Sequence, residues 1–449
     1  MIAVFKVRLL LLAVIVVSSV SLFAAADHEE EMHQPPPAMP LQSQPVIPEH
    51  QDISGPFCEG SEVTDACLDC HEESARDFMK TRHWTWSSKQ YVYEKGWIDT
   101  GKKHGMNNFC YGVASNMTRC SECHAGYGWV DDSFDFDDPT NIDCLVCHDT
   151  TGTYRRIGGG DGGLADPATD FERVARNVGK PGRYNCGQCH FYGGAGHGVK
   201  HGDLDKELLN TTRDIDVHMA ADGLNYQCSN CHFAKNHQLM GTSMSLTPSG
   251  DLAATCRDCH KPEPHEKGAL NFHIKNVSCQ ACHIPYYAKA QATNMSWDWS
   301  KAGKKTEYER NEQGLVLYSP TKGVYTWEKD LLPEYAWFNG LAGIHVWGEK
   351  INPDEPVKMN WPVGQKDDGT SKIFPFKVHH GRQMYDSKNN FLINPHLFGI
   401  EGLVDDFQSW ERSAEIGMKA RGLEFSGEYD FIDNLMYLRI NHMLSLIHI

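Results

Sequence analysis

The longest uninterrupted apolar run of the chain lies near the N-terminus, over residues 9–17. It follows the basic residues Lys6 and Arg8, and small residues come after it at 24–26. This order is typical of a signal peptide. The run is shorter than the roughly 20 residues of a membrane-spanning helix, which favours a cleaved signal peptide over residues 1–26 rather than a retained anchor. We therefore expect an exported protein in an oxidising compartment, the bacterial periplasm.

Residues 27–56 contain few large apolar side chains. They include the acidic run 29–31 and the proline run 35–37. A segment of this kind cannot bury enough apolar surface to offset the entropy lost on ordering. The sequence therefore predicts a disordered, Pro-rich linker.

Residues 57–283 show no sustained hydrophobic period. Glycine clusters interrupt the segment, as at 158–163 and 193–194. Such clusters mark turns and loops, so we expect short helices joined by long loops. One helix is predicted over residues 171–178, with Asp170 as its capping residue.

Residues 284–449 contain no cysteine but seven of the eleven tryptophans. Apolar spacing predicts helices over 406–420 and 431–443, and short strands over 324–327 and 372–378. We expect a C-terminal lobe that packs on the preceding segment. The predicted fold class is mainly α with long loops and little regular strand.

The charge of the chain is strongly acidic, with 42 basic and 59 acidic side chains and a net charge of -17. Loss of Lys6 and Arg8 with a signal peptide would change -17 to -19. A nucleic-acid-binding protein needs a basic surface, so nucleic acid is excluded as a partner. The charge favours solubility after signal cleavage and a basic redox partner protein.

Cysteine is the residue type that carries the strongest signal. Composition alone predicts about 0.03 Cys-x-x-Cys-His motifs in a chain of this length, and the sequence contains seven. Their uneven intervals exclude a strict repeat. The motifs are Cys67, Cys70 and His71; Cys120, Cys123 and His124; Cys144, Cys147 and His148; Cys186, Cys189 and His190; Cys228, Cys231 and His232; Cys256, Cys259 and His260; and Cys279, Cys282 and His283.

The spacing within each motif suits covalent haem attachment. The two thiols can form thioethers with the vinyl groups of one haem, and the adjacent histidine then ligates the iron. Paired Cys-x-x-Cys units can instead bind zinc, but zinc does not require a histidine after every second cysteine. We therefore predict seven sites for haem c, whose porphyrins would supply most of the apolar core.

The second axial ligands must come from outside the motifs, where seventeen histidines remain. A haem with histidine on both faces can only pass electrons, whereas chemistry needs one iron with a weak or displaceable distal ligand. His28, His33, His50 and His448 are set aside because they fall in the linker or at the chain end. The candidates are His83, His201, His218, His237, His265, His273, His379 and His442.

Five stretches of the chain closely resemble the octahaem c-type cytochromes of the tetrathionate reductase family. Several of these stretches are longer than a haem motif requires, and the resemblance covers residues 56–443. They are KTRHWTW at 80–86, DCLVCHDTTGTY at 143–154, NVGKPGRYNCGQCHFYGG at 177–194, VKHGDLD at 199–205 and RINHM at 439–443.

The resemblance implies a periplasmic reductase in which most haems are bis-histidine and one, at the second motif with His124, has a distal lysine. It implies reduction of tetrathionate, and also of nitrite and hydroxylamine, with electrons from a redox partner protein or a quinol-linked cytochrome. A lysine amine ligates iron only when it is deprotonated, so it can yield to substrate. A non-catalytic conduit with every iron bis-histidine is the alternative. An oxidase resembling hydroxylamine oxidoreductase is a third possibility.

The chain departs from the family in two respects. The family has eight haems, and an eighth motif would lie just beyond residues 439–443, so we interpret the C-terminal lobe as truncated there; a natural seven-haem variant is the alternative. The position where the family would place its lysine holds Arg155 and Arg156, and arginine cannot ligate iron. Lys103, Lys180 and Lys200 are the remaining candidates for the catalytic distal ligand.

Two cysteines lie outside the motifs, Cys58 and Cys110. A disulfide between them would suit an oxidising compartment. A free thiol near the active haem, suited to sulfur-oxyanion chemistry, is the alternative.

Overall fold

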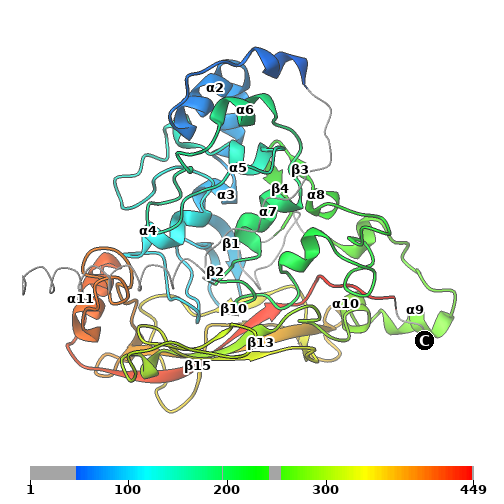
Figure 1. Cartoon of the computed structure of the whole chain (residues 1–449). Helices are drawn as coiled ribbons and strands as arrows, with labels where there is room; N and C mark the ends of the chain where they lie inside the picture. The colour runs from blue at the N-terminus through cyan, green and yellow to red at the C-terminus, as the bar shows by residue number, and fades with distance from the viewer. Residues whose placement is uncertain (1–46, 195, 242–253, 447–449) are drawn as a thin grey trace, which may run out of the picture.

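The computed structural model describes residues 47–194, 196–241 and 254–446. Figure 1 shows short helices and loops of the haem-motif segment above a broad sheet formed by the C-terminal segment. The predicted signal peptide and most of the predicted linker lie outside the described residues. Within the described residues, no helix combines the length and the apolar character needed to cross a membrane.

Apart from α2, which has 19 residues, the helices of the haem-motif segment are short, as its sequence predicts. The predicted helix at 171–178 is observed as Phe171–Arg176, and the Asp170 side chain accepts a hydrogen bond from the Arg173 backbone amide. Two small hairpins interrupt the helices. The elements are α2 Gly60–Phe78, α3 Arg82–Thr85, β1 Ser88–Val92, β2 Gly96–Thr100, α4 Met117–Cys120, α5 Leu145–His148, α6 Phe171–Arg176, α7 Arg183–His190, α8 Cys228–Cys231, β3 Ala234–Lys235, β4 Gln238–Leu239, α9 Gly268–His273 and α10 Cys279–His283.

The C-terminal segment is dominated by strands. The described part contains one α-helix, α11 at Trp410–Ala420. The strands are β5 Thr293–Asp298, β6 Glu309–Arg310, β7 Val316–Ser319, β8 Gly323–Glu328, β9 Glu334–Phe338, β10 Ala342–Ile344, β11 Val357–Lys358, β12 Asn360–Pro362, β13 Lys372–Asp386, β14 Phe391–Leu392 and β15 Tyr429–Arg439.

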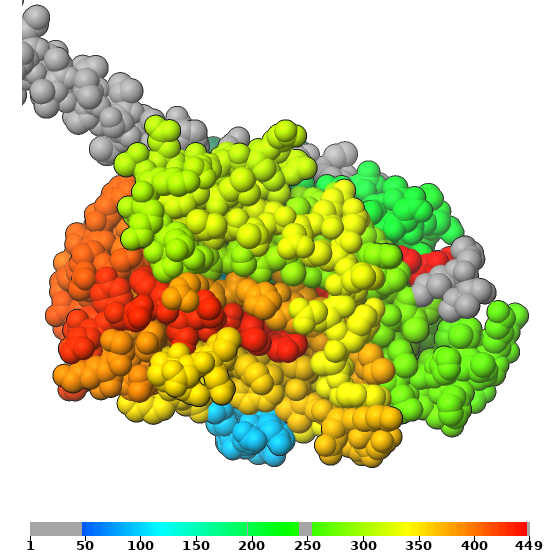
Figure 2. Space-filling view, turned by 90° about the horizontal axis from the view of Figure 1, so that it is seen from below, coloured from blue at the N-terminus to red at the C-terminus, as the bar shows by residue number. Residues whose placement is uncertain are grey.

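Nine strands of the described part form one mixed sheet, in the order β11-β15-β13-β5-β8-β7-β6, with β9 and β14 also paired to β13. The long strand β13 lies at its centre, antiparallel to β15 and parallel to β5. Figure 2 views the molecule from the side of this sheet, and the hairpin β1–β2 projects beside it. The hairpin is attached there because the Tyr93 amide donates to the Ala342 carbonyl of β10, at 2.9 Å.

The prediction of a mainly α fold with little regular strand is wrong, because this sheet forms much of the C-terminal segment. The predicted helix at 431–443 is instead β15, and the predicted strand at 372–378 extends to Asp386. Ile432 and Met436 are four residues apart, which suits a helical face. They are equally compatible with a strand, and Asn434 and Leu438 are buried on the same side. The pairing of this segment with β13 makes it a strand rather than a helix.

The sheet also has an apolar core of its own side chains, so haems do not supply most of the core here. Trp297 and Trp299 stack with ring centres 4.9 Å apart. The same buried cluster takes in Phe109, Tyr111 and Val199 from the haem-motif segment. The walls of the haem-motif segment are thereby fixed against the sheet.

Candidate haem sites and active site

A large cavity of about 2900 Å³ runs through the described part of the haem-motif segment. All fourteen motif cysteines and all seven motif histidines line it. The motifs lie in helical turns, which bring the two cysteines of each motif, three residues apart, to one side of the chain. Thiol pairs with an adjacent imidazole, repeated around an apolar cavity, are the donor set that covalent haem requires, so the residues fit this cofactor.

Histidine pairs in the cavity have the spacing of axial ligands. A histidine nitrogen binds a first-row metal at about 2.0–2.1 Å, and the ring centre lies about 1.1 Å behind it. Two rings on opposite sides of one iron therefore have centres about 6.2 Å apart. Among the described residues, six motif histidines each have a second histidine at 6.1 to 6.4 Å. The pairs are His71 with His50, His148 with His237, His190 with His83, His232 with His442, His260 with His218, and His283 with His265.

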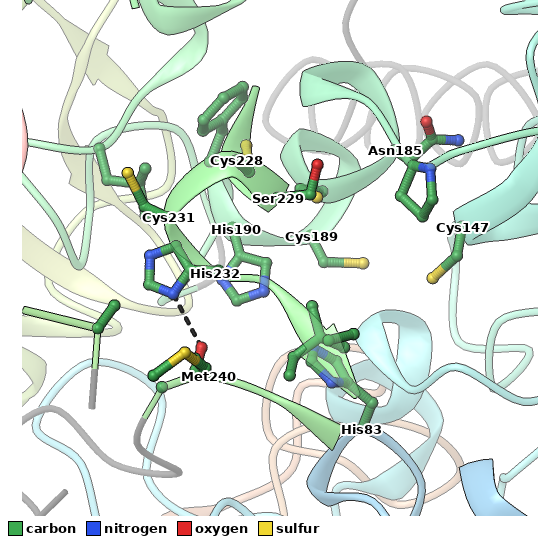
Figure 3. A pocket seen from close by; sticks show the side chains of 18 of the residues that line it. His83, Cys147, Asn185, Cys189, His190, Cys228, Ser229, Cys231, His232 and Met240 are labelled. Atoms are coloured by element: carbon green, nitrogen blue, oxygen red, sulfur yellow. Dashed lines mark hydrogen bonds between the residues drawn. The ribbon is translucent and has the colours of Figure 1, made fainter. Parts of the chain in front are cut away.

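Figure 3 shows one of these regions, where His83 and His190 project into the same part of the cavity. His83 comes from α3 and His190 from α7, so segments far apart in the sequence supply the two rings. Nearby, Nδ1 of His232 lies 2.9 Å from the Met240 carbonyl. That contact favours the Nδ1–H tautomer, which leaves Nε2 free for iron.

The structure brings five of the eight predicted distal histidines, His83, His218, His237, His265 and His442, to such positions. His201 and His273 line the cavity without a histidine ring at that spacing among the described residues. His379 lies outside the cavity, buried in β13, where its ring nitrogens contact Asn108 and Asn294. Sequence reasoning missed His50, which follows Pro48 in a short 3-10 helix, Pro48–Asp52.

His124 of the second motif differs from the other six motif histidines. Its ring neighbours among the described residues are aromatic, with Trp129 at 4.9 Å, Trp84 at 5.1 Å and Trp86 at 5.3 Å. No described histidine lies opposite it. Nε2 donates to the Trp84 carbonyl at 2.7 Å, so in this structure it faces the main chain of α3, unlike Nε2 of His232, and Nδ1 has no hydrogen-bond partner among the described residues. Burial lowers the pKa of the imidazole to about 3. The ring is therefore neutral, as an iron ligand must be.

The seven motifs form one connected network through their cysteines. Thiols contact one another between the second and fourth motifs (Cys123 and Cys189), the fourth and fifth (Cys186 and Cys228), and the sixth and seventh (Cys256 and Cys279). Three further pairs of motif cysteines lie close enough to interact electrostatically. They are Cys67 with Cys144, Cys147 with Cys189, and Cys231 with Cys259. The fourth motif is thus the junction, and the second motif branches from it.

Lysines gather beside the second motif. Nζ of Lys102 donates to the Cys120 carbonyl at 2.8 Å and lies 3.9 Å from the centre of a Trp86 ring. Lys200 lines the cavity, and burial, together with the positive charge of Lys102, lowers the pKa of its amine to about 8. Lys322 also lines the cavity. This side of the cavity is therefore cationic in an acidic protein.

The other two candidate lysines lie in different surroundings. Nζ of Lys103 lies 4.8 Å from the ring centre of Phe136, and this side chain does not line the cavity. Lys180 is at the cavity edge but exposed. Of the three, Lys200 has the environment best suited to a neutral amine.

Cys58 and Cys110 are both free thiols in the structure, and Cys58 is exposed. Cys110 lines the cavity near Cys120 and Lys102. Burial raises the pKa of the Cys110 thiol to about 12. The thiol is therefore protonated at neutral pH and forms part of the cavity wall.

The chain is similar in sequence and in fold to a known c-type cytochrome. A solved structure of octaheme cytochrome c from Shewanella oneidensis is 45% identical to this chain, covers 88% of it and 90% of its own length, and superposes with a TM-score of 0.83. The family described as "Cytochrome c bacterial" matches residues 294–446. An uncharacterized protein of Archaeoglobus fulgidus is 26% identical over 230 residues, which are 40% of this chain and 75% of that protein.

Proposed function

This chain belongs to the octahaem c-type cytochromes, and from that premise we propose that it is a periplasmic reductase whose active site is formed at the second motif. The observation that carries the proposal is the contrast between His124 and the other six motif histidines. Those six have a histidine at axial-ligand spacing. His124 has only aromatic ring neighbours among the described residues. An exchangeable position is what substrate chemistry at iron requires.

Lys200 is the residue that we propose as the distal ligand of this site. It lies on the same cavity as His124, beside Lys102, and with a pKa of about 8 roughly a tenth of the amine is neutral at pH 7. A neutral amine can bind iron, and protonation releases it. Lys103 does not line the cavity, and Lys180 is exposed.

The proposed substrate is tetrathionate. Bound haem c supplies iron that carries one electron at a time. Two electrons break the central S–S bond of one tetrathionate dianion and yield two thiosulfate dianions, without uptake of a proton. Lys102 and Lys322 are placed to attract such a dianion into a site of low dielectric constant. Nitrite and hydroxylamine remain candidates because the same cations and the same exchangeable position would serve them.

The connected motifs support a second part of the proposal. Electrons from a redox partner protein or a quinol-linked cytochrome would reach the second motif through the fourth. The net charge of -17 favours a basic partner. A non-catalytic conduit is the competing function, and the lack of a described histidine opposite His124 argues against it.

Turnover by the full-length, haem-loaded protein tests the proposal. A reduced viologen dye would supply electrons, with tetrathionate, nitrite and hydroxylamine offered separately. We expect reduction of at least one substrate, a more than tenfold loss of kcat in Lys200→Met, and unchanged kcat in Lys89→Met, which alters an exposed lysine of β1. Absence of turnover with all three substrates, together with exclusively bis-histidine spectra, would establish the conduit instead.

A further inference from the structure

Arg156 encloses the main chain of the second motif. Its guanidinium donates to the carbonyls of Glu122 at 3.0 Å and Gly126 at 2.8 Å, and also to the carbonyl of His124. The side chain is only 8% exposed. A buried cation is therefore held against the loop that carries the proposed catalytic histidine. The sequence suggests only that this position cannot supply a distal ligand.

The counter-charge of Arg156 is Asp143, whose side chain is fully buried. Nε of Arg156 lies 2.7 Å from Oδ2 of Asp143. The carboxylate also accepts hydrogen bonds from the hydroxyls of Tyr154 at 2.8 Å and Tyr127 at 3.0 Å, and from the Val146 amide at 2.9 Å. These neutral donors satisfy the remaining lone pairs of the buried carboxylate without water.

The two charges of the ion pair face different haem motifs. The guanidinium end acts electrostatically on Cys123 and His124 of the second motif and on Cys189 of the fourth. The carboxylate end adjoins the third motif, because Asp143 directly precedes Cys144. Both charges act on the pKa of the Cys147 thiol in the third motif, and the raising effect of Asp143 exceeds the lowering effect of Arg156. The positive end thus faces the second and fourth motifs, and the negative end faces the third.

Charges buried in this way are screened weakly, since neither water nor salt ions surround them. Reduction of ferric haem removes one positive charge. A neighbouring cation therefore favours the reduced form, and a neighbouring carboxylate favours the oxidised form. The same ion pair acts with opposite sign at its two ends.

We propose that the Arg156–Asp143 pair is an internal electrostatic bias, which makes the haem of the second motif easier to reduce than the haem of the third. An electron on the third-motif haem is thereby drawn toward the fourth and second motifs. The functional advantage of this bias rests on the proposed function, because it assumes that electrons are consumed at the second motif. The bias itself does not depend on any substrate.

Potentiometric titration of the haem-loaded protein, followed by electron paramagnetic resonance, measures this bias without turnover. The second-motif haem would be identified by its signal that is not bis-histidine. A His237→Met background would mark the third-motif haem, because His237 pairs with His148. In Arg156→Gln we expect the ferric-to-ferrous ratio of the second-motif haem to rise about tenfold at a fixed potential, a fall of about 59 mV for a one-electron couple. In Arg156→Lys, which keeps the charge, we expect less than half of that shift.

Asp143→Asn provides an independent measurement if Arg156→Gln fails to load its haems. The asparagine keeps the size of the side chain and removes its charge. The reduction potential of the marked third-motif haem should therefore rise by a similar amount. Tyr154→Phe is the matched control, because it removes a hydrogen bond from the same carboxylate without changing a charge. Equal shifts in Arg156→Gln and Arg156→Lys, or no shift of the marked haem in Asp143→Asn, would overturn the proposal. Failure of turnover with every substrate would leave these potentials unaffected and would count against the proposed function alone.

Discussion

The imidazole rings of His265 and His283 lie 6.1 Å apart and are parallel to within 3°. The rings of His50 and His71 are instead inclined at 71°, and those of His83 and His190 at 69°. Parallel rings act on the same iron d orbital and split the orbital pair strongly, whereas perpendicular rings leave the pair nearly degenerate. If these pairs ligate iron, we expect the ferric haems to give at least two classes of low-spin signal.

Electron paramagnetic resonance of the oxidised protein checks this expectation. The most rhombic signal should come from the seventh-motif haem, a less rhombic one from the fifth-motif haem, whose rings are inclined at 34°, and highly anisotropic signals from haems with steeply inclined rings. His265→Met should remove the most rhombic signal and leave the others. A uniform spectrum from all bis-histidine haems would contradict the ring geometry.

The Lys200 amine should make the second-motif spectrum depend on pH. The pKa is lowered to about 8 by burial and by Lys102. The amine is therefore neutral and able to ligate above that pH, and becomes protonated and released as pH falls. Iron competes with the proton, so the observed midpoint should lie at or below about 8.

A pH titration of the ferric visible spectrum measures that midpoint. Lys200→Met should abolish the transition. Lys102→Met should shift the pKa of the free amine upward, because it removes a like charge. A transition that survives unchanged in Lys200→Met would assign it to another residue.

Lys377 of β13 should control the position of Lys200 without touching the haem. Its buried Nζ donates to the carbonyls of Val199 at 2.8 Å and Lys200 at 3.1 Å, and to the Thr293 hydroxyl at 2.7 Å. Lys377→Met would leave these acceptors without their donor, at about 1–3 kcal/mol for each buried group. We expect partial loss of the lysine-ligated spectrum, with the haem content per chain unchanged.

The matched control is Lys358→Met, an exposed lysine of β11. Spectra at fixed pH and denaturant unfolding would be recorded for both variants. Identical spectra in the two variants would show that β13 does not position Lys200.

His50 should be the distal ligand of the first-motif haem. His50→Met would replace histidine–histidine by histidine–methionine ligation there, which raises the reduction potential of one haem. Redox titration should show one haem moved to higher potential and the others retained. His104→Met, an exposed histidine outside the cavity, serves as the control, and an unchanged titration in His50→Met would exclude the pairing with His71.

The fold could be predicted only where local signals decide it. Asp170 marks the start of α6 because its side chain caps the helix. By contrast, Ile432 and Met436 fit a helix or a strand, and only pairing with the distant β13 makes their segment β15. A long central strand that joins many partners leaves little trace in any one window of sequence.

The site shows the same division between local and long-range information. The covalent attachment of each haem is specified within five residues, as in Cys120 to His124, and can be read directly. Distal ligation depends on which side chain reaches across the cavity. The sequence therefore places His50 in a linker and offers His379 as a distal ligand, although β13 holds His379 in a hydrogen-bond network with Asn108 and Asn294.

The position of β13 late in the chain has a consequence for biosynthesis. His379 holds Asn108, and Lys377 holds the backbone of residues 199–200. Both anchors come from a strand that follows the seven Cys-x-x-Cys-His motifs in the sequence. The cavity walls therefore cannot be fixed against the sheet until these seven motifs have been synthesised. We expect this delay to leave an interval in which haem can be attached to their thiols before the sheet closes.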